Sequence, residues 1–136
     1  MAFDREIAAL TIFCEASDQS PECRRAIAFS LFNRMRENPQ RYGSTIAAVC
    51  LKRMQYSEWN ADAADNANLL RAASTPATDK VMMDCLSAYQ TAIAGGSDPS
   101  NGATHFYANS IPAPAWTANA TLAAQIGNVL FWRDVP

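Results

Sequence analysis

The hydrophobic pattern divides the chain into a long helical part and a short β-rich part. Apolar residues recur at helical spacing from the N-terminus to about residue 94. This pattern predicts helices over residues 4–16, 20–38, 44–51, 61–73 and 79–94. The second of these is apolar over so broad a face that we expect it at the centre of the fold.

Helix start and stop signals support these limits. Asp4 is expected to cap the first helix, and Ser44 to open the third. Ser20-Pro21-Glu22 combines a cap, a proline at the first helical position and an acid, which is typical of a helix N-terminus. The helix over 79–94 should end at Gly95-Gly96.

The residue pattern changes from helical spacing to turn and strand signals after Gly96. Residues 97–102 are rich in turn formers, and the alternating residues that follow predict a strand over 103–108. A second strand over 129–132 is expected to pair with it. The predicted class is α+β, mainly helical with a small antiparallel sheet near the C-terminus, in one domain spanning residues 1–136.

Composition and charge narrow the range of partners. Hydrophobic residues make up 49% of the chain, which is typical of a folded globular protein. The formal net charge is -2, so a broad basic face for binding nucleic acid is not expected. No apolar run approaches the roughly 20 residues of a membrane span or the h-region of a signal peptide. We therefore expect synthesis in the cytoplasm, no stable membrane association and a monomer.

Cysteine and histidine are too sparse for a metal site. The four cysteines, Cys14, Cys23, Cys50 and Cys85, form no C-x-x-C pair, and His105 is the single histidine. We expect no metal and no cofactor. Three cysteines fall on apolar helical positions, which favours free thiols in the core over two disulfides.

Several polar or aromatic groups carry the candidate chemistry. They are Cys14-Glu15-Ala16, Asn33-Arg34, Gln55-Tyr56-Ser57-Glu58-Trp59, Asp98-Pro99, Gly102-Ala103-Thr104-His105-Phe106-Tyr107 and Trp116. In this order they resemble the cell-wall hydrolase family typified by the spore-cortex lytic enzymes, related to the SleB and CwlJ proteins. The most specific part is the run over 98–107, supported by Ile126-Gly127-Asn128. Many members carry histidine next, where this chain has Val129.

The resemblance implies a lysozyme-like domain that cleaves the glycan strand of peptidoglycan, with Glu15 as the catalytic acid. Residue chemistry agrees, because a glycosidic oxygen leaves only when it is protonated, and a carboxyl can protonate it near neutral pH where apolar surroundings raise its pKa. Glu15 follows Phe13 and Cys14 at the end of an apolar helix. A solvated helix-end glutamate is the alternative.

The same resemblance suggests the residues of a substrate groove. The predicted substrate-binding residues are Gln55, Tyr56, Ser57, Trp59, Thr104, His105, Tyr107 and Trp116. Amides and hydroxyls suit the polar groups of sugars, and aromatic faces stack on sugar rings. A hydrogen-bonded structural role is the stronger interpretation for His105, a structural pairing for Asn33-Arg34, and a turn-forming role for Asp98-Pro99 and Gly102.

Other functions are compatible with the same residues. A cell-wall cysteine amidase or endopeptidase would use Cys14 and His105, and a non-catalytic glycan-binding module would use Trp59, Tyr107 and Trp116. A Ser57-His105-Asp98 hydrolase lacks the expected nucleophile elbow.

The motif also bears on the reaction and its setting. Glu15 has no second carboxylate beside it in the motif, which favours a lytic transglycosylase over a hydrolase that uses Asp18, Glu22 or Glu58. The bare domain suggests a phage endolysin that reaches the wall from the periplasm after its release.

Overall fold

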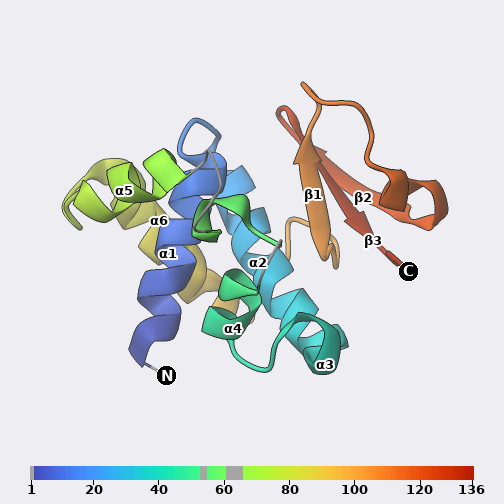
Figure 1. The fold of residues 1–136 in the computed structure, drawn as a ribbon, viewed down its shortest axis with the longest axis horizontal. Helices are drawn as coiled ribbons and strands as arrows, with labels where there is room; N and C mark the ends of the chain where they lie inside the picture. Colours follow the sequence, from blue (N-terminus) through green and yellow to red (C-terminus); the bar gives the residue numbers. More distant parts are fainter. Residues whose placement is uncertain (1, 53–54, 61–65) are drawn as a thin grey trace.

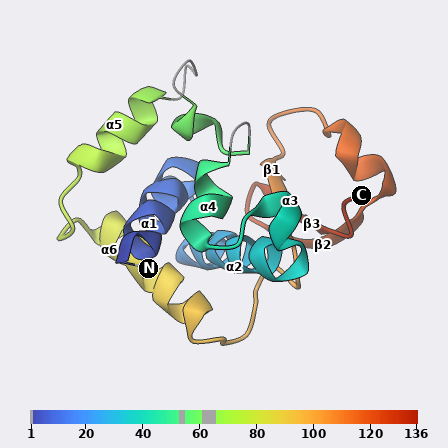
Figure 2. The ribbon, with the colours of Figure 1, turned by 60° about the horizontal axis from the view of Figure 1, so that its bottom comes forward.

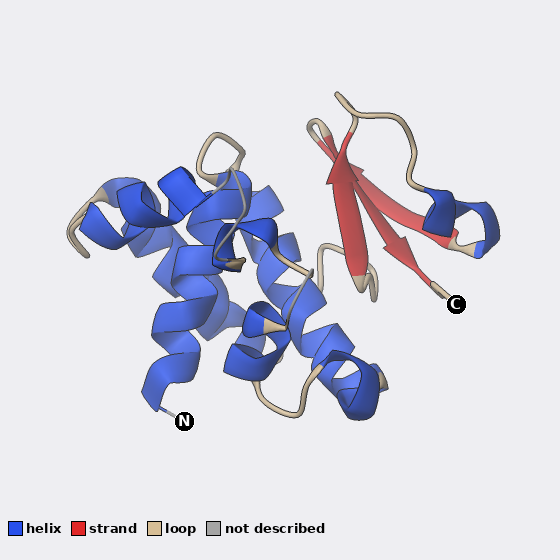
Figure 3. Cartoon of the chain, in the orientation of Figure 1, coloured by secondary structure: helices blue, strands red, loops and turns tan. Residues whose placement is uncertain are grey.

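In the computed structural model, a layer of helices faces a small β-sheet, and the strands gather at one side of the molecule (Figures 1 and 3). The structure describes residues 2–52, 55–60 and 66–136. The helices are α1 (Ala2–Ala16), α2 (Pro21–Glu37), α3 (Pro39–Tyr42), α4 (Ile46–Leu51), α5 (Asn66–Ser74) and α6 (Lys80–Ile93). The remaining elements are the short 3-10 helices η1 (Ser57–Trp59) and η2 (Ala115–Asn119) and the strands β1 (His105–Ala108), β2 (Thr121–Ile126) and β3 (Val129–Arg133).

Helix α2 is the centre of the helical layer, as its apolar pattern predicts. It contacts α1, α3, α4 and α6, and Figure 2 shows α1, α3 and α4 arranged along it. The Ser20 side chain caps its first turn by accepting from the backbone N–H of Cys23 at 3.1 Å. Ile27 and Leu31 are completely buried. Burial on this scale is the main favourable contribution to the stability of the fold.

Two predicted helix caps were wrong. Asp4 lies inside α1, and its Oδ1 accepts instead from the backbone N–H of Ala47 at 2.9 Å. The cap of α4 is Thr45, not Ser44, because the Thr45 side chain accepts from Ala48 at 3.0 Å. Asp4 thus supports the start of α4, a partner far away in the sequence.

The later helices follow the predicted limits closely. Asp79 caps α6 by accepting from the backbone N–H groups of Val81 and Met82, each at 3.0 Å. Helix α5 confirms part of the helix predicted over 61–73, of which residues 61–65 lie outside the described part. No described helix is long and apolar enough to cross a membrane.

The sheet contains three antiparallel strands in the order β1-β3-β2. β1 pairs with β3 as predicted, with His105 opposite Trp132 and Ala108 opposite Val129. Strand β2 was missed in the sequence. It forms a tight hairpin with β3 through Gly127-Asn128, where Gly127 takes a φ of 57° that favours glycine.

The cysteines of the chain are all free, which confirms the prediction of unpaired thiols. Cys23, Cys50 and Cys85 are buried, and Cys14 is half-buried. The architecture confirms the α+β class, mainly helical with a small antiparallel sheet near the C-terminus.

Candidate active site

Glu15 lies where the helical layer meets the sheet. It occupies the last turn of α1 and is half-buried. It lines a cavity of about 330 Å³ together with Phe106 and Tyr107 of β1 and Val129 of β3. An acid with an apolar wall on one side and access from solvent on the other is placed to give a proton to a bound substrate.

A second cavity of about 330 Å³ shares one lining residue, Phe106, with the first. The polar and aromatic residues of its wall are Arg34, Arg41, Gln55, His105 and Trp116. We call the two cavities together the central groove. A polymer lying along it would contact Glu15 in one half and Gln55 and His105 in the other.

Arg34 of α2 joins three segments beneath the groove. It is only 5% exposed, and it donates through Nε to the backbone carbonyl of Thr104 and through Nη1 to Oε1 of Gln55. Its guanidinium carbon lies 5.2 Å from the ring centroids of both Tyr42 and Tyr56. A buried guanidinium needs such partners to offset its lost hydration. Arg34 therefore positions Gln55 and the start of β1.

The neighbouring Asn33 holds the turn that leads into β1. Its Nδ2 donates to Oδ2 of Asp98 and to the carbonyl of Ala103, each at 2.9 Å. Asp98 also accepts from the backbone N–H groups of Ser100 at 2.8 Å and Gly102 at 2.9 Å. These bonds support the predicted structural roles of Asn33-Arg34 and of the Asp98-Pro99 turn.

His105 is a neutral side chain in the wall of the groove. Burial, together with the positive charges of Arg34 and Arg41, lowers its pKa to about 3. Its Nδ1 lies 2.8 Å from the Thr104 hydroxyl, and its ring centroid is 5.0 Å from that of Trp116. The structural interpretation of His105 fits this setting, since a neutral imidazole held by neighbours can orient a sugar without taking part in proton transfer.

Tyr107 and Trp116 belong to an aromatic cluster on the sheet. The ring of Trp116, on η2, lies 5.9 Å from that of Tyr107 and 6.2 Å from that of Trp132. Tyr107 lines the cavity of Glu15 and Trp116 lines the second cavity. Their contact with substrate remains a prediction, and their position at the groove is compatible with it.

Three predicted substrate-binding residues do not face the groove. Thr104 is completely buried and Tyr56 is 2% exposed, so neither has surface to offer a sugar in this structure. Their contact with substrate stays a prediction that their burial does not favour. Trp59 packs against the core, and its Nε1 donates to Oγ1 of buried Thr11 at 2.8 Å. Ser57 is exposed at the first position of η1, and its role stays a prediction.

The structure also shows features of the site that the sequence did not predict. Phe106 is the shared wall of the two cavities, and Arg41 lines the second one. Glu58 is 3% exposed, although nothing in its sequence context predicts burial. Burial and, after it, the charges of Glu58 and Glu15 raise the pKa of the Cys14 thiol to about 12, so both carboxylates act on this thiol.

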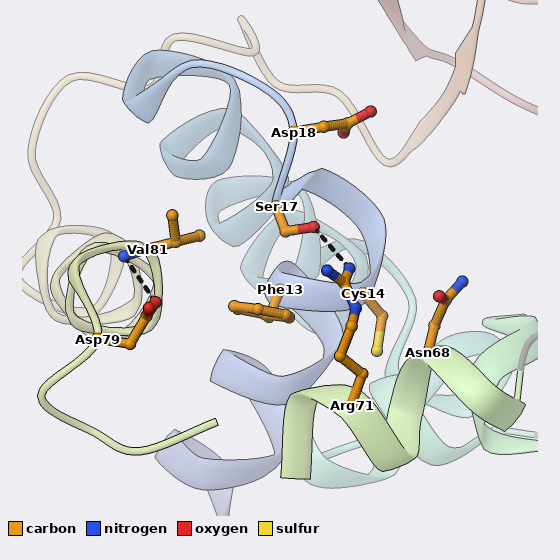
Figure 4. Close-up of a pocket in the computed structure, with 8 residues that line it drawn as sticks. All are labelled: Phe13, Cys14, Ser17, Asp18, Asn68, Arg71, Asp79 and Val81. Carbon is orange, nitrogen blue, oxygen red and sulfur yellow. Dashed lines mark hydrogen bonds between the residues drawn. The ribbon is translucent and has the colours of Figure 1, made fainter. Parts of the chain in front are cut away.

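Neither alternative nucleophile fits the arrangement. Cys14 lines a different cavity, shown in Figure 4, while His105 lines the central groove. With a pKa of about 12, the thiol holds its proton at neutral pH and lacks the reactive thiolate form. The Ser57-His105-Asp98 hypothesis fails as well, because Asp98 is engaged in the turn before β1.

Comparison with known proteins decides the family. The model of the cell wall hydrolase family matches residues 18–132. The chain belongs to this family. Membership confirms the resemblance seen in the motifs and implies peptidoglycan as the substrate. The match begins just after Glu15, so the role of Glu15 rests on the motif and on its place in the groove.

Solved structures share the fold. The catalytic domain of the Bacillus cereus SleB protein has a TM-score of 0.73 and 17% sequence identity, covering 96% of this chain and 90% of that one. The catalytic domain of the germination-specific lytic transglycosylase SleB from Bacillus anthracis has a TM-score of 0.72 and 17% identity, with 96% and 94% covered. No curated protein sequence matches significantly.

Among the described residues, no group of histidine, cysteine and acidic side chains could hold a metal ion.

Proposed function

We propose that this cell wall hydrolase cleaves the glycan strand of peptidoglycan as a lytic transglycosylase. The observation that carries the proposal is the half-buried carboxyl of Glu15, which lines the central groove beside Phe106, Tyr107 and Val129. The fold is also similar to that of a protein described as a lytic transglycosylase.

In the first step, Glu15 donates its proton to the glycosidic oxygen as the bond from that oxygen to the muramic-acid C1 breaks. The ionised carboxylate then takes the proton of the 6-hydroxyl of the same sugar while O6 bonds to C1. The products are a 1,6-anhydro end and a strand with a new hydroxyl, and Glu15 is protonated again. No water is consumed, so one carboxyl is sufficient.

The rest of the groove supplies groups suited to sugars. The Gln55 amide, held by Arg34, can bond sugar hydroxyls or an N-acetyl group, and neutral His105 can donate or accept. The aromatic rings of Tyr107 and Trp116 offer faces and edges to the sugar rings.

Hydrolysis is the competing reaction, because two more carboxylates lie near Glu15. Asp18 lines the same cavity and is exposed, and Glu58 is buried nearby. Either one would have to activate a water molecule or attack C1.

Product analysis distinguishes these reactions. Purified peptidoglycan is digested, treated with borohydride and analysed by mass spectrometry. We expect muramic-acid ends that are lighter by one water and resist reduction. Reducible muramic-acid ends would contradict the transglycosylase reaction. An Asp18→Asn variant would then show whether Asp18 is needed for hydrolysis. Cuts only between glycan and peptide would contradict glycan cleavage itself.

A further inference from the structure

A third cavity, separate from the two that form the central groove, lies between α1, α5 and α6 (Figure 4). Its wall carries charges of both signs. Its volume is about 490 Å³, within the usual range for ligand sites. The polar residues of its wall are Ser17, Asp18, Asn68, Arg71 and Asp79. We call it the side cavity.

Two contacts orient the Arg71 side chain in the side cavity. It rises from α5 towards the end of α1, and its Nη2 donates to Oγ of Ser17 at 3.1 Å. Its guanidinium carbon lies 5.3 Å from the ring centroid of Phe13. These two contacts orient the planar group and leave other N–H donors for a ligand carboxylate, which a guanidinium binds well.

The opposite wall carries negative charge. Asp79, at the start of α6, uses Oδ1 for the helix cap, so its carboxylate is fixed and keeps further acceptor capacity. Asp18 adds a second carboxylate. The Cys14 thiol, which also lines the cavity, stays neutral, since burial raises its pKa. A ligand that matches this cavity carries both a carboxylate and an ammonium group, which an uncharged sugar does not.

Asp18, on the loop that follows α1, lines both the side cavity and the cavity of Glu15. A substituent on a sugar bound at Glu15 would enter the side cavity past this residue. An extended peptide advances roughly 3.3–3.6 Å per residue, so three or four residues span on the order of 10–14 Å. A substituent of that length would extend past Asp18 towards Arg71.

We propose that the side cavity binds the stem peptide of the muramic acid that occupies the Glu15 site. This inference rests on the proposed function. The stem peptide is a short chain, attached through the lactyl group of muramic acid, that bears free carboxylates and, at a diamino acid, an amino group. Arg71 binds a carboxylate of this peptide, and Asp79 binds the ammonium group.

Binding measurements test the proposal. The full chain with Glu15→Gln is titrated with the GlcNAc–MurNAc disaccharide, either bare or carrying a stem tetrapeptide. We expect the peptide to tighten binding about tenfold, and Arg71→Gln to remove this gain, as for the loss of a charged hydrogen-bonded pair. The Asp79→Asn variant keeps an oxygen that can cap α6, so the helix should remain intact. It should reduce the gain in affinity for a peptide with a free amino group. It should not change the gain for a peptide whose amino group is acetylated.

Arg36→Gln is the matched control, because exposed Arg36 stacks on Phe32 at 5.8 Å in the same way but lies on α2. It should leave the gain unchanged. Equal affinity for the two ligands would overturn the proposal, as would an equal loss in the Arg36 and Arg71 variants. Failure of the unmodified protein to cut glycan would contradict the proposed function instead, and the two titrations would still show whether the peptide is bound.

Discussion

At the scale of single residues, the groove combines the Glu15 carboxyl with side chains that are held still by neighbours. Gln55 is fixed by Arg34, and His105 by Thr104 and Trp116. Pre-positioned groups of this kind lower the entropy that must be lost when substrate and acid align. In the proposed mechanism, these side chains orient the substrate for proton transfer by Glu15.

Glu15→Gln should therefore abolish glycan cleavage without unfolding the protein. The amide keeps the shape of the carboxyl but cannot transfer the proton, and loss of a general acid costs roughly 100- to 10,000-fold in rate. Turbidity loss of a peptidoglycan suspension and a thermal melt measure the two effects. Glu37→Gln is the matched control, since Glu37 also ends a helix but is exposed. A folded Glu15→Gln protein with normal turnover would remove Glu15 from the mechanism.

At the scale of elements, the central helix α2 organises the groove by reaching the turn before β1. Asn33 and Arg34, adjacent on that helix, contact the turn through Asp98 and through the carbonyls of Ala103 and Thr104. The sheet is thereby set opposite the helices at a fixed distance. The position of β1, and with it one wall of the groove, depends on these bonds.

Asp98→Ala should lower the free energy of unfolding by roughly 2–4 kcal/mol, because it removes the acceptor of several partly buried donors. Chemical denaturation measures this loss. Ser97→Ala, an exposed neighbour in the same loop, should change the unfolding free energy little. If Asp98→Ala kept full stability, Asp98 would not be the support of this turn.

At the scale of the whole molecule, His105 links stability to pH. Its pKa is about 3 in the folded protein and about 6.5 in the unfolded chain. Between these values the unfolded chain binds more protons than the folded one, so stability rises with pH across this window and is lost as pH falls.

Lowering the pH from 7.5 to 5 should therefore reduce the free energy of unfolding of the unmodified protein by about 1 kcal/mol more than it reduces that of a His105→Gln variant. This figure allows for the partial exposure of the ring. The difference corresponds to roughly 3–5 °C in Tm for a chain of this size. Thermal melts of both proteins at the two pH values measure it. Parallel losses would show that His105 titrates normally in the folded state.

Much of the helical layer could be predicted because its signals are local. Caps such as Ser20 and Asp79 act within one turn, and apolar spacing shows which face of a helix is buried. Asp4 was misjudged because its partner, Ala47, lies far along the chain. Strand β2 was missed because its short side chains alternate weakly, although Gly127-Asn128 between two apolar runs was a hairpin signal.

The sequence by itself determined the family, the α+β class and the choice of Glu15, since these rest on residue types in a fixed order. Only the tertiary structure decided which motif residues face the groove. Tyr56 and Gln55 are neighbours in the chain, yet one is buried and the other is exposed. Thr104 is buried as well, while the next residue, His105, is half-buried. Burial depends on what packs against a segment from elsewhere in the chain, and here Arg34 of α2 places both pairs.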